Sequence, residues 1–388
     1  MAAPVRFALD PDVEAFREEV RRLLEVEADP IIPSQSVFPQ MDTPEKRAFV
    51  AKLAARGWLG LTWPPEYGGG GRNEIYRLVL QEELEYAGMP SMSIEVGMVG
   101  QTLIRHASEE MKREFLPRIA AGELNIALGY SEAQAGSDLA ALELRAERDG
   151  EGFVLNGQKM WTSAAHFADL VWLACRTDPA APRHHGISLF LVDLDSPGIE
   201  VQRIDTMGGH RTNLVFFTDV AVPASRLVGE VDRGWTYIVD ALDYERLAGF
   251  PFGGLQRDLD ELVAWARDTG AVDDPDIRRL LAQLSVRVDG ARTHLLRGYD
   301  RVSRHEVPTY EATMLKVALT ELRQDMADAV LDALGPPGLL RENDPAAPLA
   351  GRFEHNWRLE IITTIAAGTN EIQRTILARG HLGLPSGS

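Results

Sequence analysis

Apolar residues recur at helical spacing through the first third of the chain. Near the N-terminus, Asp10 and Pro11 supply an N-cap and a first-turn proline, and one apolar face follows. That face comprises Val13, Phe16, Val20, Leu23 and Leu24. Similar start and stop signals predict three more helices: Thr43 to Gly57, residues 73–87 and residues 108–121. We therefore expect a helical region up to about Gly122.

The pattern changes in the middle of the chain to short runs rich in β-formers. These runs occupy residues 153–155, 170–175, 187–192 and 214–217. Turn dipeptides separate them, at Asp149-Gly150, Asn156-Gly157 and Pro197-Gly198. Regular short strands without intervening helices predict an antiparallel sheet or barrel.

The helical period returns from Trp235 onward. The expected helices cover about 232–267, 275–304, 308–334 and 353–380. The whole pattern predicts an α+β fold with three domains. These are an N-terminal helical domain (1–122), a middle antiparallel β-sheet or barrel domain (123–231) and a C-terminal four-helix bundle (232–388).

Charge narrows the classes of partner. The 388 residues include 40 Lys and Arg against 58 Asp and Glu, a formal net charge of −18. An acidic surface disfavours non-specific contact with nucleic acid or anionic membrane, although a local pocket can still bind a phosphate-bearing ligand. No run approaches the roughly 18 apolar residues of a membrane-spanning helix. The one cysteine, Cys175, lies in an apolar run, so we expect a buried side chain and a cytoplasmic, reducing location.

Two simple motifs carry no expected chemistry, and a third motif is absent. His184 and His185 are adjacent and cannot easily face one ion, so we predict a polar loop and no metal site. The glycine run at residues 68–71 follows no strand, which favours a flexible connector over a phosphate loop. No Gly-x-Gly-x-x-Gly follows a strand, so nicotinamide binding is not supported.

Two segments of the middle region are more specific when taken together. Residues 129–138 read GYSEAQAGSD and residues 159–163 read KMWTS. The first alone is compatible with an ordinary turn, and the second with ordinary packing. In this order they resemble the flavin-facing signatures of the acyl-CoA dehydrogenase family. Four more segments match in order along the chain: WPPEYGG (63–69), FLP (115–117), DVAVP (219–223) and GTNEIQR (368–374). The nearest resemblance is to bacterial members that act on bulky acyl groups, including steroid side-chain CoA esters.

The resemblance implies FAD as cofactor and assigns residues to it. Ser163 would place a hydroxyl near flavin N5, Ser131 would bond the pyrimidine end, and Trp161 would stack on the ring. Ser137 would also touch the pantetheine of CoA. The complete set of implied cofactor residues is Tyr130, Ser131, Gly136, Ser137, Trp161, Thr162, Ser163, Gly368, Thr369 and Glu371. Gly368 and Thr369 would lie against the pyrophosphate and ribityl region, where a helix N-terminus favours anions.

The catalytic base is expected at an alternative position. Many family members carry a glutamate just before the last Gly-Thr, where this chain has Ala367. A subset carries it in a Leu-x-x-Glu-Arg context, which matches Leu242 to Arg246 and makes Glu245 the implied base. The competing interpretation is an exposed helical glutamate paired with a neighbouring arginine. Arg246, Ala367 and Ser137 are the implied substrate-binding residues.

The implied reaction is α,β-desaturation of an acyl-CoA thioester. Glu245 would remove the α-proton, with its pKa raised by burial once substrate expels water. The Ala367 N–H and the flavin ribityl 2′-hydroxyl would polarise the thioester carbonyl, while hydride passes from the β carbon to N5. Small residues at 366–368, with Gly249, Gly253 and Gly254, suit a wide acyl site, although glycine equally serves close helix packing.

The expected partners are acyl-CoA, an electron-transfer flavoprotein-type acceptor and further subunits. In the family, the adenine end of each flavin is held by a neighbouring subunit, through Arg-x-x-Phe-Gly and Gln-x-x-Gly-Gly segments. Here residues 267–271 read RDTGA and residues 332–338 read DALGPPG, so both segments are degraded. This predicts an α2β2 tetramer with a paralogous subunit, with a homotetramer as the alternative. A flavin-poor structural subunit, or a flavin oxidase or monooxygenase on the same fold, also stays open.

Overall fold

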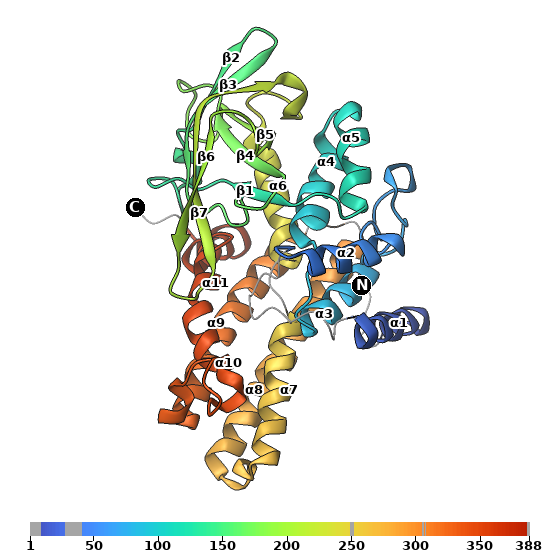
Figure 1. Ribbon diagram of the computed structural model, residues 1–388, viewed down its shortest axis with the longest axis vertical. Helices are drawn as coiled ribbons and strands as arrows, with labels where there is room; N and C mark the ends of the chain where they lie inside the picture. The colour runs from blue at the N-terminus through green and yellow to red at the C-terminus, as the bar shows by residue number, and fades with distance from the viewer. Residues whose placement is uncertain (1–8, 28–40, 249–251, 305, 307, 386–388) are drawn as a thin grey trace. The chain divides into compact units, whose positions relative to one another are not determined.

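The computed structural model describes residues 9–27, 41–248, 252–304, 306 and 308–385. The chain divides into two compact units. The helical unit comprises Met1–Pro39, Asn73–Ser91 and Arg246–Ser388, and the sheet unit comprises Gln40–Arg72 and Met92–Glu245. The predicted order of helices, then a sheet, then helices is confirmed (Figure 1). The bounds of the three predicted domains stay a prediction.

Two helices of the sheet unit, α2 (Pro44–Ala55) and α5 (Glu109–Ala120), begin where a side chain caps them. The other helical elements of this unit are η1 (Pro65–Tyr67), η2 (Ser93–Gly100), α4 (Gln101–His106), η3 (Leu139–Ala141), η4 (Ala224–Arg226) and α6 (Gly234–Ala248), whose last residues pass into the helical unit. Thr43 accepts from the Lys46 N–H and Ser108 from the Met111 N–H, so both predicted starts are confirmed. The η2 element is a π-helix, and its wider turn hides it from a search for a period of 3.6 residues.

Eight strands of the described chain form one sheet. They are β1 (Ile126–Gly129), β2 (Arg145–Asp149), β3 (Gly152–Lys159), β4 (Leu170–Arg176), β5 (Ile187–Asp193), β6 (Ile199–Asp205), β7 (Arg211–Pro223) and β8 (Leu227–Val228). The order is β6-β7-β3-β2-β4-β5-β8, and β1 pairs with β4. All four predicted strands are present.

The sheet is mainly antiparallel, as predicted, and also contains parallel pairs. Strand β1 runs parallel to β4, and β2 makes one parallel pair with it, whereas the other pairings are antiparallel. The chain from β1 to β4 passes through β2 and β3, so the connection is long enough to return in the same direction. The predicted burial of Cys175 is confirmed, and burial raises the pKa of its thiol to about 12.

The glycine run at residues 68–71 is a closed turn, so its prediction as a flexible connector was wrong. Gly70 donates to the Gly60 carbonyl and Gly71 to the Trp63 carbonyl, both at 2.9 Å. A Cβ atom on Gly69 would lie 2.1 Å from the Trp63 carbonyl oxygen. Glycine is needed here because two backbone segments touch, a tertiary contact that composition does not reveal.

The helical unit is built around α3, α8 and α9. Its elements are α1 (Pro11–Glu27), α3 (Glu74–Tyr86), α7 (Phe252–Asp268), η5 (Ala271–Asp273), α8 (Pro275–Ser303), α9 (Thr309–Leu334), η6 (Pro336–Leu339), η7 (Pro348–Gly351), α10 (Arg352–Leu359), α11 (Ile361–Ile365), α12 (Asn370–Ile376) and η8 (Leu377–His381). Helix α3 packs against α1, α7 and α8, while α9 packs against α8, α10 and α12. Helices α7 and α8 run side by side in Figure 1.

Two predicted long helices are interrupted. The segment predicted over 232–267 contains α6 and α7, and residues 249–251 between them lie outside the described residues. The helix predicted over 353–380 is broken after Ile365, because Ala367 and Gly368 adopt left-handed φ angles of +54° and +82°.

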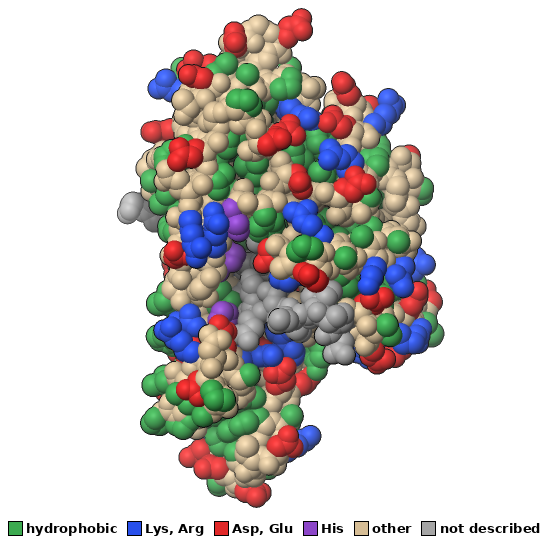
Figure 2. Space-filling view, viewed as in Figure 1, with side chains coloured by type: hydrophobic (Ala, Val, Ile, Leu, Met, Phe, Trp, Pro, Cys, Tyr) green, Lys and Arg blue, Asp and Glu red, His purple; other side chains and the backbone are tan. Residues whose placement is uncertain are grey.

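The surface carries both signs of charge. Figure 2 shows Lys and Arg interspersed with Asp and Glu on the face in view, within an excess of acid over base for the whole sequence. None of the helices in the described ranges has the length and apolar character needed to cross a membrane.

Candidate functional site

The two signature segments of the sheet unit lie side by side. Lys159 is the last residue of β3, and the Met160 N–H that follows it donates to the Ser131 carbonyl at 2.9 Å. The Lys159 ammonium donates to the Tyr130 carbonyl at 3.0 Å. Segments that are about thirty residues apart in sequence therefore form one local structure.

A buried ion pair fixes this junction. The Lys159 ammonium lies 2.7 Å from Glu132, with 0% and 3% of the two side chains exposed. The Glu132 carboxylate also accepts from the Glu143 and Leu144 N–H groups at 2.7 and 2.9 Å. Burial lowers the pKa of Lys159, and the Glu132 charge opposes that shift. The ion pair is thus embedded in further hydrogen bonds, which offset the cost of desolvating two charges.

The loop after Glu132 presents its backbone to solvent. Glu132 and Ala135 exchange two backbone hydrogen bonds at 3.0 and 3.1 Å, which close a tight turn. Gly136 and Ser137 follow it and are exposed, with nothing within 4 Å of the position of a Gly136 Cβ. The structure therefore leaves both residues accessible to a ligand.

Trp161 and Thr162 have features that fit a bound flavin. Trp161 has a left-handed φ of +64°, and 54% of its surface is exposed despite its large ring. Thr162 is buried, and its Oγ1 has no hydrogen-bond partner among the described residues. Its backbone is fixed by Asn213, through bonds of 3.0 and 2.8 Å. The open aromatic face of Trp161 suits stacking by a planar ring, whereas the enclosed Thr162 hydroxyl shapes the segment beneath it.

Ser163 lies between two polar residues that sequence reasoning missed. Its Oγ is 3.1 Å from His210 Nε2 and donates to Thr212 Oγ1 at 3.2 Å. Burial lowers the pKa of His210, which favours the neutral ring. His210 and Thr212 reach Ser163 because β3 pairs with β7, with Lys159 opposite Val215. No local signal in the sequence shows this register.

The last signature lies in the helical unit. Its first residues interrupt the helical structure between α11 and α12. Thr369 caps α12 by accepting from the Ile372 N–H at 3.3 Å. Gln373 is fully buried, and its side-chain amide donates to the Ala367 and Gly368 carbonyls, each at 3.1 Å. These bonds fix the peptide planes of a left-handed segment. Glu371 is exposed on the first turn of α12, where its own backbone N–H and the Thr369 hydroxyl lower its pKa.

Side chains of helix α9 form hydrogen bonds with residues on both sides of this segment. The fully buried Lys316 donates to Asn370 Oδ1 at 2.6 Å and to the Thr364 carbonyl at 3.2 Å. About two turns further along α9, Arg323 pairs with the buried Glu360 at 2.8 Å. The break in the helical chain is thus rigidly held, although nothing in the GTNEIQR motif names these α9 partners.

The implied base, Glu245, is described by its backbone alone. Glu245 lies in α6, but its side chain and that of Arg246 are outside the described residues, as is Gly249. Of the glycines expected to widen the acyl site, Gly253 instead packs on α3, where a Cβ would lie 2.1 Å from the Glu82 carbonyl. This supports the close-packing interpretation for that residue.

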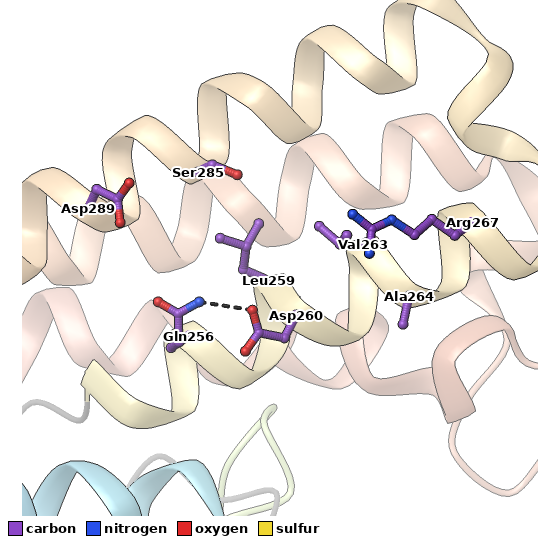
Figure 3. Close-up of a pocket in the computed structure, with 8 residues that line it drawn as sticks. All are labelled: Gln256, Leu259, Asp260, Val263, Ala264, Arg267, Ser285 and Asp289. Carbon is purple, nitrogen blue, oxygen red and sulfur yellow. Dashed lines mark hydrogen bonds between the residues drawn. The ribbon is translucent and has the colours of Figure 1, made fainter.

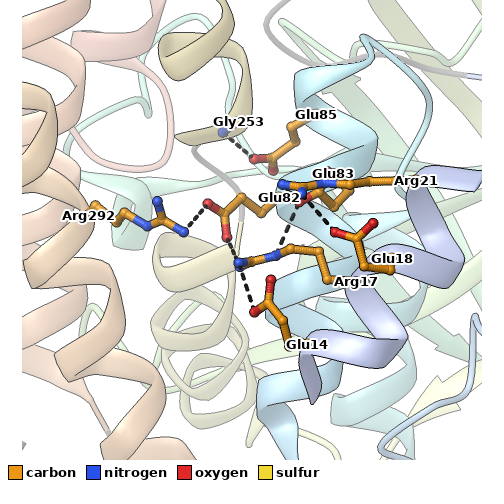
Figure 4. A network of polar contacts seen from close by, with 9 residues as sticks. All are labelled: Glu14, Arg17, Glu18, Arg21, Glu82, Glu83, Glu85, Gly253 and Arg292. Carbon is orange, nitrogen blue, oxygen red and sulfur yellow. Dashed lines mark hydrogen bonds and ion pairs between the residues drawn. The ribbon is translucent and has the colours of Figure 1, made fainter. Parts of the chain in front are cut away.

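A polar network joins α1, α3, α7 and α8 in the helical unit (Figure 4). Arg17 pairs with Glu82 at 3.2 Å, and Arg292 pairs with the same carboxylate at 3.2 Å. Glu85 is buried and accepts from the Gly253 N–H at 3.2 Å. Desolvation raises the pKa of Glu85 to about 7, so this carboxyl titrates near neutral pH.

A polar hollow of about 420 Å³ lies between α7 and α8 (Figure 3). Its lining combines Arg267 with two carboxylates, Asp260 and Asp289, and Gln256 donates to Asp260 at 2.9 Å. The acidic lining disfavours a phosphate group here. Within the described ranges, no three or more His, Cys, Asp or Glu side chains gather as metal ligands, and the His184 ring lies 4.4 Å from that of Trp235.

Three family models match the chain in order. They are the acyl-CoA dehydrogenase N-terminal domain over residues 10–123, the middle domain over 127–220 and the C-terminal domain over 232–382. A curated relative, acyl-CoA dehydrogenase FadE26 of Mycobacterium tuberculosis, is 36% identical, with 98% of this chain and 99% of the relative covered.

Two solved structures are also similar over nearly the whole chain. The Tcur3481-Tcur3483 steroid ACAD is 36% identical with a TM-score of 0.91, covering 99% of this chain and 100% of that one. The ChsE4-ChsE5 complex from Mycobacterium tuberculosis is 35% identical with a TM-score of 0.88, covering 98% and 100%. Each of these structures is named for two proteins, and the second is described as a complex of the two.

Proposed function

This chain belongs to the acyl-CoA dehydrogenase family, and we propose that it desaturates the CoA thioester of a bulky, steroid-type acyl group. The family reaction is an FAD-dependent oxidation, so the chain is an oxidoreductase. The observation that carries the finer substrate class is the full-length similarity to a steroid enzyme at 36% identity. Ala366, Ala367 and Gly368 add small side chains where a large acyl group needs space.

Glu245 is the base of the proposed reaction. The α-proton of a thioester is weakly acidic, so its removal needs a carboxylate in a dry site. Ala367 has no group that can accept a proton, whereas Glu245 stands in the Leu-x-x-Glu-Arg context on α6. Arg246 follows it and contributes to substrate binding.

The Ala367 N–H polarises the thioester carbonyl in this proposal. Donors aimed at developing charge act best when they are already held in place. Gln373 supports this role because it holds the Ala367 and Gly368 carbonyls at 3.1 Å each, and so limits rotation of this segment. Thr369 and Glu371 complete the proposed contacts of the last signature with the cofactor.

Residues of the sheet unit hold the flavin ring. Bound FAD supplies the hydride acceptor, flavin N5. Trp161 offers its exposed ring for stacking, the Ser163 hydroxyl offers a polar contact, and Thr162 joins the two residues along the ring. Ser131 and Tyr130 bond the pyrimidine end. Gly136 and Ser137 take the cofactor edge and the pantetheine, and their exposure supports that role.

The active assembly in this proposal is a heterotetramer with a paralogous subunit. The segment at Arg267 lacks the family phenylalanine, and the hollow beside it carries Asp260 and Asp289, which repel a pyrophosphate. A partner with intact segments would complete the adenine end of the flavin site. An electron-transfer flavoprotein-type acceptor reoxidises the enzyme.

A substrate panel tests the substrate class. Thermal shift against acyl-CoAs, followed by anaerobic bleaching of the flavin, should rank polycyclic and branched thioesters above butyryl-CoA in kcat/KM. Equal or better turnover of butyryl-CoA contradicts the steroid-type acyl group. A colourless protein that stays inactive with every candidate partner favours the structural-subunit alternative.

A further inference from the structure

The hydroxyl of Ser163 has an unusual pair of neighbours. Its Oγ lies 3.1 Å from His210 Nε2 and 3.2 Å from Thr212 Oγ1, both within hydrogen-bond distance. Thr212 is 2% exposed, and Thr206 Oγ1 donates to the His210 carbonyl at 2.6 Å, which anchors the histidine backbone just before β7. The three side chains are therefore held as a short chain.

Counting hydrogens fixes the direction of the bond from His210. A serine hydroxyl has one hydrogen and two lone pairs. When the hydrogen of Ser163 is directed at Thr212, a bond between Ser163 and His210 requires the ring to donate. A neutral histidine carries one N–H, and burial lowers the pKa of His210 and keeps it neutral. In that arrangement the hydrogen must be on Nε2.

We propose that His210 is a positioning residue for Ser163, donating from Nε2–H so that the serine hydrogen can turn from Thr212 to an acceptor atom of the flavin ring. The proposal rests on the proposed function, which brings the flavin to Ser163. The serine keeps one hydrogen bond throughout the turn, so its oxygen stays in place. Donation into Oγ also polarises the hydroxyl and makes it a stronger donor to the flavin.

The opposite tautomer of His210 could not donate a hydrogen bond to Ser163 Oγ from Nε2. With the hydrogen on Nδ1, His210 Nε2 becomes an acceptor and competes with the flavin for the single hydrogen of Ser163. The two tautomers therefore predict different consequences of replacing His210. An apolar residue weakens the serine donor if Nε2–H is present, and frees the serine hydrogen if it is not.

Two variants and a control separate these outcomes. His210→Leu removes the donor, whereas His210→Gln keeps an amide donor at similar reach. His185→Leu is the control, because His185 is exposed in the polar loop. FAD content, KM, the rate of flavin reduction at saturating acyl-CoA and the flavin midpoint potential are measured on the active holoenzyme.

We expect His210→Leu to retain FAD, keep KM within about twofold, and reduce its flavin about tenfold or more slowly, since a hydrogen bond to a developing charge is lost. Its midpoint potential should become more negative. His210→Gln should retain most of the rate. A wild-type rate in His210→Leu, or equal losses in both variants, overturns the proposal.

The tautomer gives a readout that does not depend on turnover. Nitrogen-15 NMR of the histidine-labelled protein should show the hydrogen of His210 on Nε2, and a hydrogen on Nδ1 overturns the proposal. A wild-type protein that binds no FAD and oxidises no acyl-CoA removes the proposed function. The tautomer measurement still decides the His210–Ser163 bond in that case.

Discussion

Lys159 and Glu132 form a buried ion pair at 2.7 Å, and this pair ties the end of β3 to the turn that begins at Glu132. The same ammonium donates to the Tyr130 carbonyl. Any ligand held by both signature segments therefore depends on the buried Lys159–Glu132 ion pair, which keeps the two segments together. Stability and cofactor retention should be coupled through this one interaction.

Replacing Lys159 by Met should be strongly destabilising. The change leaves Glu132 buried without its counter-ion, which typically costs about 3–5 kcal/mol. Urea denaturation measures the free energy of unfolding, and absorbance measures the FAD retained. We expect both to fall. The matched control is Arg183→Met, which breaks the exposed Arg183–Asp138 pair near the same turn and should have little effect. Wild-type stability and flavin content in Lys159→Met contradict this prediction.

Glu245→Gln tests the proposed base. The variant should retain the fold and bind FAD and acyl-CoA, because the amide closely matches the carboxylate in shape. Its rate of flavin reduction should fall at least about a thousandfold, because both the base and its charge are lost. Stopped-flow bleaching measures that rate. Glu110→Gln, on the exposed face of α5, serves as the control.

Near-normal reduction in Glu245→Gln would end the assignment of the base. A second variant moves the carboxylate to the position used by other family members. The double change Ala367→Glu with Glu245→Gly should recover part of the activity, and toward straight-chain substrates in particular, since a glutamate at 367 takes space from the acyl group.

Glu85 should make stability depend on pH between about 4.5 and 7. Its pKa is raised to about 7 in the folded protein, so in that window the folded state holds a proton that the unfolded state has released. Stability therefore falls as pH rises through the window. Glu85→Gln cannot ionise, so its gain over wild type should be about 2.5 kcal/mol larger at pH 8 than at pH 5.

Denaturation curves at the two pH values check this difference. Glu18→Gln is the control, because Glu18 is exposed at the edge of the same network (Figure 4). The same Glu85→Gln minus wild-type difference at both pH values would show that Glu85 does not titrate in this range.

The chain purified alone should be poor in flavin. The degraded adenine-end segments at 267–271 and 332–338 leave a homomeric site incomplete, so co-expression with a paralogous subunit should restore colour and activity. Mass photometry and flavin-to-protein ratios measure the assembly, and the expected complex has fewer flavins than chains. One tight flavin per subunit in an active homotetramer would rule out the heteromer.

Features that depend on neighbouring residues could be predicted from the sequence. Thr43 and Ser108 cap helices because a side-chain oxygen meets an N–H three residues away, and the apolar runs of β4 and β5 favour strands wherever they pack. The signature segments were also recognisable, because each is a contiguous string. These features established the fold class, the family and the candidate residues Ser131 and Ser163.

The tertiary structure alone decided which side chains meet. Lys159 reaches Glu132, and His210 reaches Ser163, only because β3 and β7 pair in one register and the chain turns back at Glu132. Shifting a strand by one residue turns every side chain to the other face, so such pairings depend on the whole sheet. The break at Ala367 likewise depends on Gln373, whose bonds hold a left-handed backbone that helix propensity alone would not predict.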